Sequence, residues 1–156
     1  MTISDIRKDF PILSRKIYGK DLIYFDNGAS TQKPEQVITE IENCYRSEYS
    51  NVHRGLHYLS NNLTDKFEAV RDKIGVYLGA ESPSEIVFTT GSTASLNLVA
   101  RGWGEHNLKK GDEVILSVLE HHSNIVPWHF LREKIGIKIV WVDINPEGFL
   151  EIEEIV

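Results

Sequence analysis

Apolar positions change their spacing along this chain, and the spacing predicts the order of its elements. Over residues 35–47 and 62–79, apolar side chains recur every three or four positions, as on one buried face of a helix. Pro34 suits the first turn of the earlier helix, and Gly79 suits the C-cap of the later one. The first half of the chain is therefore expected to be mainly helical.

The N-terminal segment predicts two shorter elements. Ser4 can cap a short helix that Pro11 helps to end. Residues 22–25 have the composition of a brief strand, and it runs into residues 26–30, where turn-forming side chains dominate. A turn that follows a strand is a common place for binding residues.

The second half alternates strand-like and helix-like runs. We expect strands at residues 85–89, 113–118 and 137–144, separated by helices at residues 94–103 and 125–135. This alternation favours an α/β fold with a mainly parallel sheet and flanking helices. In such sheets ligands bind beyond the carboxyl ends of the strands. The two segments most suited to chemistry, residues 89–94 and 120–124, lie at these ends.

The composition is that of a globular protein, with 41% hydrophobic and 26% charged residues. The net charge of −6 comes from interspersed acids and bases, so no basic face for nucleic acid is expected. No apolar run approaches the roughly 20 residues that cross a bilayer, and residues 1–8 lack the apolar core of a secretory signal. Cys44 is the only cysteine, which excludes a disulfide within the chain and favours the cytoplasm.

The end of the chain suggests a longer protein. Residues 145–148 form a predicted turn, and residues 151–156 start what reads as a new element. A parallel sheet of so few strands would leave an outer edge in need of a neighbour. We therefore expect the chain to be a fragment.

The first candidate segment is TTGSTA, residues 89–94, between a predicted strand and a predicted helix. A helix N-terminus has unpaired N–H groups and partial positive charge, which stabilise a phosphate. Gly91 would let the backbone approach closely, and the hydroxyls of Ser92 and Thr93 could donate further hydrogen bonds. The alternative is that Ser92 or Thr93 only caps the helix.

The second candidate segment is EHHSN, residues 120–124, at the next junction. The imidazole of His121 could stack on a flat ring and move protons near neutral pH. The alternative is a structural histidine held by hydrogen bonds. His122 and Glu120 are expected to orient their neighbours or to be solvated, and adjacent histidines do not suit a zinc site.

A third segment, residues 51–60, is polar and rich in histidine. It places His53, Arg54 and His57 in a predicted loop, and binding residues are frequent on loops. Arg54 could bind a carboxylate or phosphate with two hydrogen bonds, although a solvated surface loop is an equal alternative. Cys44 lies within a helix pattern and is expected to be structural.

Taken together, these segments resemble the SUF-type (class II) cysteine desulfurases of the class V aminotransferase group, which use pyridoxal 5′-phosphate. The likeness covers nearly the whole chain, and the joint occurrence of HRGLH and EHHSNIVPW is highly specific. The matching segments are DIRKDFP (residues 5–11), YFDNGASTQKP (24–34), NVHRGLHYLS (51–60), GSTASLNLVA (91–100) and EHHSNIVPW (120–128).

The resemblance implies a role for each matching residue. Ser92 and Thr93 would bind the cofactor phosphate, and His121 would stack over the pyridine ring as a catalytic residue that handles protons. His53 would lie near the substrate. The loop of Asn27, Gly28 and Ala29 would form the mouth of the substrate site. Gly28 and Ser92 stand where relatives often have alanine and threonine, but serine still supplies a hydroxyl.

The resemblance also implies a fold and an activity. The fold would be part of the large domain of a fold-type I pyridoxal-phosphate enzyme, with an N-terminal segment and active-site loop at residues 1–30 and an incomplete large domain at residues 31–156. The reaction would convert L-cysteine, or L-selenocysteine, to L-alanine and leave sulfur as an enzyme persulfide. A homodimer would pass that sulfur to an acceptor protein of iron–sulfur assembly.

Four residues that the family needs have no counterpart in this chain, and an aspartate and a glutamine around the pyridine ring are two of them. The lysine that binds the cofactor and the cysteine that carries the persulfide belong to later parts of such enzymes, and Cys44 is not in the family's cysteine motif. The fragment alone is therefore expected to be inactive. A related selenocysteine lyase, a kynureninase-like hydrolase, a transaminase and a non-catalytic interaction module remain as alternatives.

Overall fold

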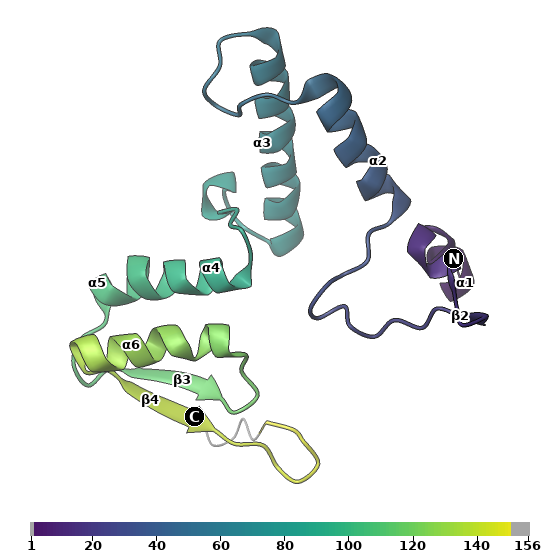
Figure 1. The fold of residues 1–156 in the computed structure, drawn as a ribbon. Helices are drawn as coiled ribbons and strands as arrows, with labels where there is room; N and C mark the ends of the chain where they lie inside the picture. Colours follow the sequence, from purple (N-terminus) through teal and green to yellow (C-terminus); the bar gives the residue numbers. More distant parts are fainter. Residues whose placement is uncertain (1, 151–156) are drawn as a thin grey trace. The chain divides into compact units, whose positions relative to one another are not determined.

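A computed structural model describes residues 2–150 and divides the chain into two compact units, Met1–Ile86 and Val87–Val156. The first unit is mainly helical, and the second combines helices with a small sheet (Figure 1). The predicted element at residues 151–156 lies outside the described residues. Within residues 2–150, no helix has the length and apolar character to cross a membrane.

The first helix begins at a capping box. Thr2 precedes α1 (Ile3–Lys8), and its hydroxyl accepts the N–H of Asp5 while the Asp5 carboxylate accepts the N–H of Thr2 at 3.0 Å. The prediction that Ser4 caps the helix is therefore wrong, because Thr2 has the carboxylate partner three residues later that Ser4 lacks. Pro11 follows the end of α1 and begins the 3₁₀ helix η1 (Pro11–Ser14).

A short antiparallel hairpin joins β1 (Lys16–Ile17) to β2 (Lys20–Asp21). The predicted strand at residues 22–25 does not form, because no strand among the described residues pairs with it. The backbone of Leu22 finds other partners, and its carbonyl accepts a hydrogen bond from the guanidinium of Arg7 at 2.8 Å.

Two helices form the larger part of the first unit. The helix α2 (Glu35–Asn43) follows Pro34 and continues as a π-helical turn, η2 (Cys44–Glu48). The long helix α3 (Tyr58–Leu78) ends at Gly79, whose φ of 75° confirms the predicted C-cap. Its start lies earlier than predicted because His57 caps it. Lys66 and Glu48 join α3 to η2 at 2.5 Å.

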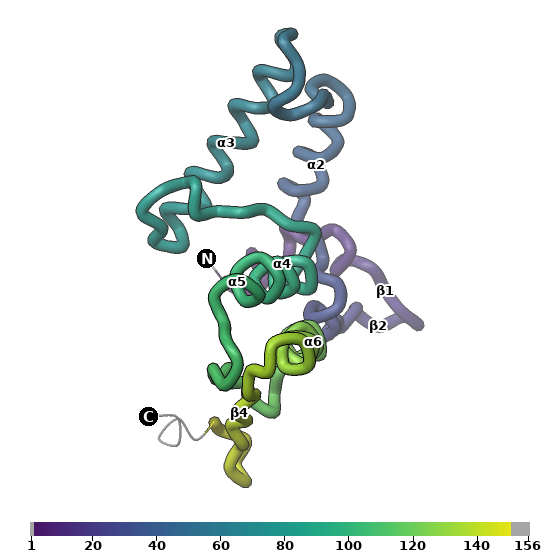
Figure 2. The backbone as a smooth tube through the Cα atoms, turned by 90° about the vertical axis from the view of Figure 1, so that its left-hand side faces the viewer, coloured from purple at the N-terminus to yellow at the C-terminus, as the bar shows by residue number. Residues whose placement is uncertain are grey.

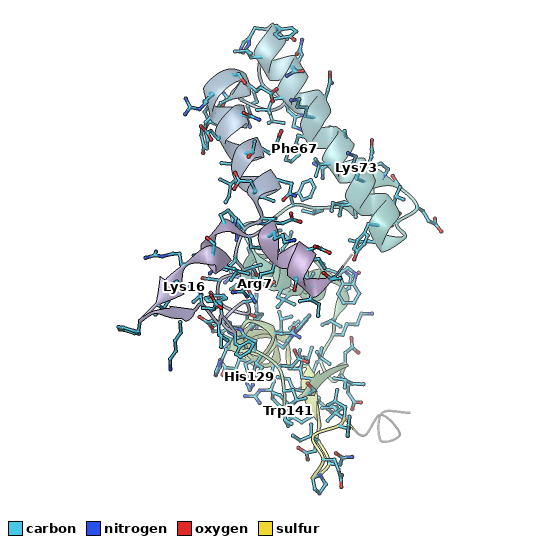
Figure 3. The ribbon with its side chains drawn as sticks, turned by 90° about the vertical axis from the view of Figure 1, so that its right-hand side faces the viewer. Arg7, Lys16, Phe67, Lys73, His129 and Trp141 are labelled. Atoms are coloured by element: carbon cyan, nitrogen blue, oxygen red, sulfur yellow. The ribbon has the colours of Figure 1, made fainter. Side chains whose placement is uncertain are left out.

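A groove beside α2, η2 and α3 is lined mostly by apolar side chains, including Cys44 of η2 and Phe67 of α3. Figure 3 shows the Phe67 side chain on α3. After α3, the 3₁₀ helix η3 (Pro83–Glu85) closes the unit.

The second unit contains the predicted parallel pair. Strand β3 (Glu113–Ser117) and strand β4 (Lys138–Val142) pair in register from Glu113 with Lys138 to Ser117 with Val142. The helix α6 (Val126–Ile135) crosses between them and covers one face of the sheet (Figures 1 and 2). In Figure 3, His129 of α6 lies near Trp141 of β4, with ring centroids 6.3 Å apart.

A third layer packs on the other side of α6. It is a continuous helical segment made of α4 (Ser92–Leu98), the π-helical turn η4 (Val99–Gly104) and the short α5 (Glu105–Asn107). Figure 2 shows these layers nearly end-on. The core between them consists of buried apolar residues from every layer: Ala100, Leu116, Trp128, Leu131 and Ile137.

One strand of the predicted sheet is missing from the second unit. Residues 86–89 have no regular structure, and within residues 2–150 the parallel sheet has two strands. An apolar, β-branched run becomes a strand only when another strand pairs with its backbone, and neither β3 nor β4 does so here. The prediction of a strand at residues 85–89 is therefore wrong.

Candidate functional site

The turn before α4 presents the first turn of the helix to solvent. Gly91 is the N-cap with a φ of 147°, and no atom lies within 4 Å of the place where its Cβ would stand. Thr89 Oγ1 stabilises the turn, because it accepts the Gly91 N–H at 3.3 Å and lies 2.7 Å from the Ser95 hydroxyl. No described side chain caps α4, so neither Ser92 nor Thr93 makes the alternative capping bond.

His121 follows the carboxyl end of β3 and caps the 3₁₀ helix η5 (His122–Asn124). Its Nδ1 accepts the N–H of Ser123 at 3.1 Å, so the neutral imidazole carries its proton on Nε2. The ring is exposed, and the His122 ring lies edge-on to it with centroids 6.1 Å apart. The position of His121 past a strand end agrees with the sequence prediction.

A hydrogen-bonded network fixes the backbone beside His121. The Glu120 carboxylate accepts from the Ser117 hydroxyl at 3.0 Å and from the Asn124 amide at 2.9 Å. Asn124 in turn accepts the indole N–H of Trp128 at 3.1 Å. Hydrogen bonds from Asn124 and then Ser117 hold the pKa of Glu120 below its usual value.

From the sequence alone, neither Asn124 nor Trp128 was given a role in this site. The signal was the spacing of Glu120, Asn124 and Trp128, which places each four residues from the next. Glu120 has the orienting role that was expected for it.

The structure brings the two candidate segments at residues 89–94 and 120–124 into the same part of the second unit. The helix α4 contacts η5 directly, so the Ser92–Thr93 turn and the His121 turn belong to neighbouring elements. In Figure 1 the N-terminal ends of α4 and α6 lie at the same end of the unit. The first unit carries the other predicted residues, which are Asn27, Gly28, Ala29 and His53.

The loop before α3 is packed around a buried hydroxyl. Ser60 is fully buried, and its Oγ donates to the Asn51 carbonyl at 2.7 Å and accepts the Gly55 N–H at 3.0 Å. A Cβ on Gly55 would lie 2.5 Å from the Ser60 Cβ, so this position has no room for a side chain. His57 accepts the Ser60 N–H and is a helix cap, while Arg54 is exposed.

His53 is the most constrained residue of this loop. Its φ of 63° lies in the left-handed region, which is uncommon for residues other than glycine. Its N–H donates to Thr64 Oγ1 at 3.0 Å, and its Nε2 lies 3.0 Å from a carboxylate oxygen of Glu68. These two contacts orient the backbone and the imidazole of His53.

The predicted mouth residues form a tight turn beside a cleft of about 350 Å³ in the first unit. Asn27 lines that cleft, and its carbonyl accepts the Thr31 hydroxyl at 2.9 Å. The Tyr24 hydroxyl closes the turn by donating to the Ser30 carbonyl at 2.6 Å. Gly28 has open space around it and no positive φ, so an alanine would fit there.

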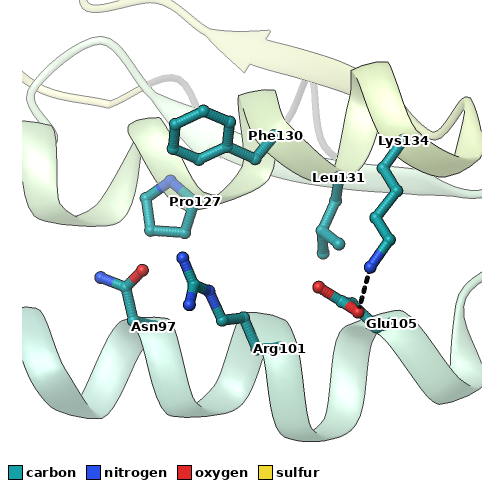
Figure 4. Close-up of a pocket in the computed structure, with 7 residues that line it drawn as sticks. All are labelled: Asn97, Arg101, Glu105, Pro127, Phe130, Leu131 and Lys134. Atoms are coloured by element: carbon teal, nitrogen blue, oxygen red, sulfur yellow. Dashed lines mark hydrogen bonds and ion pairs between the residues drawn. The ribbon is translucent and has the colours of Figure 1, made fainter.

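A second cleft, of about 320 Å³, lies between the α4–α5 segment and α6 (Figure 4). Phe130 and Leu131 line its apolar side, and the ion pair of Lys134 with Glu105 at 2.5 Å closes one end. The hydrogen bond from Lys134 lowers the pKa of Glu105. This cleft runs along the helices, away from the strand end that carries His121. Residues 2–150 contain no group of three potential metal ligands.

Residues 23–156 match the family described as Aminotransferase class-V. This chain belongs to the class-V aminotransferase family. It is 45% identical over 148 residues to a probable cysteine desulfurase of Synechocystis sp. and 44% identical over 152 residues to a cysteine desulfurase of Escherichia coli. These matches cover 95% and 97% of this chain but 35% and 37% of the relatives, so the chain spans about a third of their length.

Solved structures give the same relationship. The class-V chain superposes on the apo cysteine desulfurase of Thermococcus onnurineus with a TM-score of 0.85 and 38% identity, over 99% of this chain and 36% of that one. It superposes on a cysteine desulfurase of Escherichia coli in its S-sulfonic acid form with a TM-score of 0.78 and 32% identity, over 100% of this chain and 39% of that one. The fold is thus that of part of a fold-type I enzyme, and the family depends on pyridoxal phosphate.

Proposed function

We propose that this chain is the N-terminal part of a pyridoxal-phosphate-dependent cysteine desulfurase, which converts L-cysteine to L-alanine and retains the sulfur as an enzyme persulfide. The observation that carries the proposal is the contact between α4, with its uncapped first turn, and η5, with His121 at its cap. The likeness to cysteine desulfurases at 44–45% identity supports this reaction over others of the family.

The donors at the start of α4 fit a phosphate group. Ser92 and Thr93 supply two exposed hydroxyls and the first N–H groups of the helix, and no acidic side chain lies in that first turn. Gly91 leaves open space where a Cβ would otherwise project. We infer that Ser92 and Thr93 hold the cofactor phosphate. When bound, the cofactor supplies a ring that withdraws the electrons released at the substrate Cα.

The exposed imidazole and the free Nε2 position of His121 support a role in covering a flat ring and handling a proton. Its Nδ1 is occupied by the Ser123 N–H, which leaves the Nε2–H to be donated or exchanged. The Glu120 network keeps the preceding backbone in place. We infer that His121 is the catalytic residue of this part of the enzyme and lies over the pyridine ring.

The residues of the first unit would handle the substrate. We propose that His53 lies beside bound L-cysteine and that the turn of Asn27, Gly28 and Ala29 forms the mouth of the site. Residues 1–30 would then be the N-terminal segment and active-site loop. Residues 31–156 would be an incomplete large domain with a mainly parallel sheet, completed in the full protein by further strands.

The remaining parts of the reaction would come from outside this chain. The lysine that binds the cofactor and the cysteine that receives the sulfur have no counterpart in its motifs. We propose that the full-length protein is a cytoplasmic homodimer that passes sulfur to an iron–sulfur assembly protein, without nucleic acid or membrane as a partner.

Turnover of the full-length protein that contains this chain tests the proposal. With pyridoxal phosphate and a reductant, L-cysteine should yield L-alanine and sulfide in equal amounts. L-Selenocysteine and L-kynurenine are the comparison substrates, because related enzymes of the same scaffold act on them. Absence of alanine from L-cysteine, with turnover of either other compound, would contradict the assignment. Replacement of both Ser92 and Thr93 by alanine should weaken binding of pyridoxal phosphate more than binding of pyridoxal.

A further inference from the structure

One face of α3 is directed at the loop that carries His53. Thr64, Phe67, Glu68 and Arg71 recur at the spacing of a single helical stripe. Thr64 accepts the backbone N–H of His53 at 3.0 Å, and the Phe67 ring meets the imidazole edge-on with centroids 5.9 Å apart. Glu68 Oε1 lies 3.0 Å from His53 Nε2, and Arg71 Nε donates to the other oxygen of that carboxylate at 2.8 Å.

This arrangement holds a backbone that would not adopt its conformation unaided. A histidine in the left-handed region persists only where its surroundings over-determine it. The φ of His53 is 63°, and three side chains of α3 contact its backbone or ring. Strain of this kind gathers at functional positions, because it aims a side chain in a direction that a relaxed loop would not give.

Glu68 is the member of the stripe that sets the direction of the ring. The hydrogen bond from Arg71, followed by the positive charge of its guanidinium, holds the pKa of Glu68 below its usual value, so the carboxylate is ionised near neutral pH. The side chains of His53 and Glu68 are 51% and 40% exposed, and such exposed pairs add little to stability. The main effect of the contact between Glu68 and His53 is therefore to orient the imidazole ring.

Arg71 holds the Glu68 carboxylate in position. Its side chain is only 20% exposed, and its guanidinium carbon lies 5.2 Å from the centroid of the Phe67 ring. With Nε2 donating to Glu68, Nδ1 is the remaining ring nitrogen of the imidazole, and this atom makes no hydrogen bond within the described part of the chain.

We propose that Glu68 is a positioning residue for His53, and that it turns the Nδ1 atom of the imidazole toward the substrate. The proposal rests on the proposed function, in which His53 lies beside bound L-cysteine. Glu68 would act only through the ring that it holds, as carboxylates behind functional histidines do.

Nuclear Overhauser effects between the ring protons of His53 and Phe67 test the geometry in the full-length protein. They should be present in the wild type, retained in Glu68→Gln, which keeps an acceptor for Nε2–H, and lost in Glu68→Ala. The matched control is Asp65→Ala, one turn earlier on α3, where the exposed carboxylate makes no hydrogen bond to the described residues. Wild-type ring contacts in Glu68→Ala would overturn the proposal.

Kinetics of the full-length protein test the consequence. For L-cysteine, Glu68→Ala should raise KM about tenfold with a smaller change in kcat. The KM of Glu68→Gln should stay close to that of the wild type, and Asp65→Ala should leave KM unchanged. Equal KM values in Glu68→Ala and wild type, or an equal rise in Asp65→Ala, would also overturn it. If the wild type does not turn over L-cysteine, the proposed function fails, and the ring contacts still decide whether Glu68 orients His53.

Discussion

At the scale of single residues, three glycines of the candidate segments differ in what their position requires. Gly91 has a φ of 147° with open space around it, so its backbone conformation is the constraint. Gly55 has no room for a Cβ, because Ser60 stands 2.5 Å from that point. Gly28 has neither constraint. The requirement for glycine is therefore conformational at the turn before α4, steric in the loop of residues 51–60 and absent in the turn of residues 26–30.

Gly91→Ala and Gly28→Ala form a matched pair that tests this difference. We expect Gly91→Ala to lower the free energy of unfolding by about 1–2 kcal/mol, because alanine is strained at that φ. Gly28→Ala should leave it unchanged or slightly higher, since a residue with a Cβ restricts the unfolded chain. Urea denaturation followed by circular dichroism gives both values. Equal effects of the two substitutions would show that Gly91 relaxes without cost.

At the scale of elements, the connection from β3 to α6 is held by side-chain hydrogen bonds in addition to the backbone bonds of its short 3₁₀ turn. Glu120 joins Ser117 of the strand to Asn124 of η5, and Asn124 joins η5 to Trp128 of α6. Each bond spans three or four residues, so the network forms locally as the turn closes. Its result is a defined backbone at His121.

The lowered pKa of Glu120 makes this connection sensitive to acid. A carboxyl whose folded pKa is depressed contributes stability above its unfolded value, about 4.3, and this contribution is lost as the pH falls through the folded pKa. We therefore expect Glu120→Gln to be less stable than wild type at pH 7, and the difference to shrink below about pH 4. Thermal unfolding of both proteins from pH 3 to pH 7 measures this difference in stability.

The control for this titration is Glu133→Gln on α6. The Glu133 side chain is exposed and makes no hydrogen bond to the described residues, so this variant should follow the wild type at every pH. A difference between wild type and Glu120→Gln that is constant with pH would mean that the hydrogen bonds at Glu120 do not depend on its charge.

At the scale of the whole molecule, the chain consists of two units that bury their side chains differently. The second unit has a small closed core in which Leu131 and Ile137 are each 2% exposed. The first unit has a helical pair whose apolar groove remains open, and its fully buried side chain is the polar Ser60. The local order of the first unit therefore depends more on hydrogen bonds around the loop of residues 51–60 than on burial of apolar side chains.

Leu131→Ala tests how far the core of the second unit determines its stability. We expect the free energy of unfolding of this unit to fall by about 2–5 kcal/mol, because a fully buried leucine leaves a cavity. All three tryptophans lie in the second unit, at positions 103, 128 and 141, so tryptophan fluorescence reports its unfolding alone. The exposed Val76→Ala on α3 is the control and should not move the fluorescence transition. An unchanged transition in Leu131→Ala would contradict the assigned core.

The sequence by itself determined where the main helices lie, the glycine at which α3 ends and the family to which the chain belongs. Gly79 ends α3 with a positive φ as its position predicted, and the pattern of residues 113–118 and 137–144 correctly placed the paired strands β3 and β4. These features depend on the local backbone or on a short repeat of apolar positions, and both can be read from neighbouring residues.

Only the tertiary structure decided which strands form and which side chains hold the candidate residues. The runs at residues 22–25 and 85–89 have strand composition but no partner strand within residues 2–150. A strand needs the backbone of another strand, so its own composition cannot establish it. Glu68 likewise carries no motif, and its contact with His53 exists because the loop folds back onto α3 across fifteen positions of sequence. Partners brought together by chain reversal cannot be read from spacing alone.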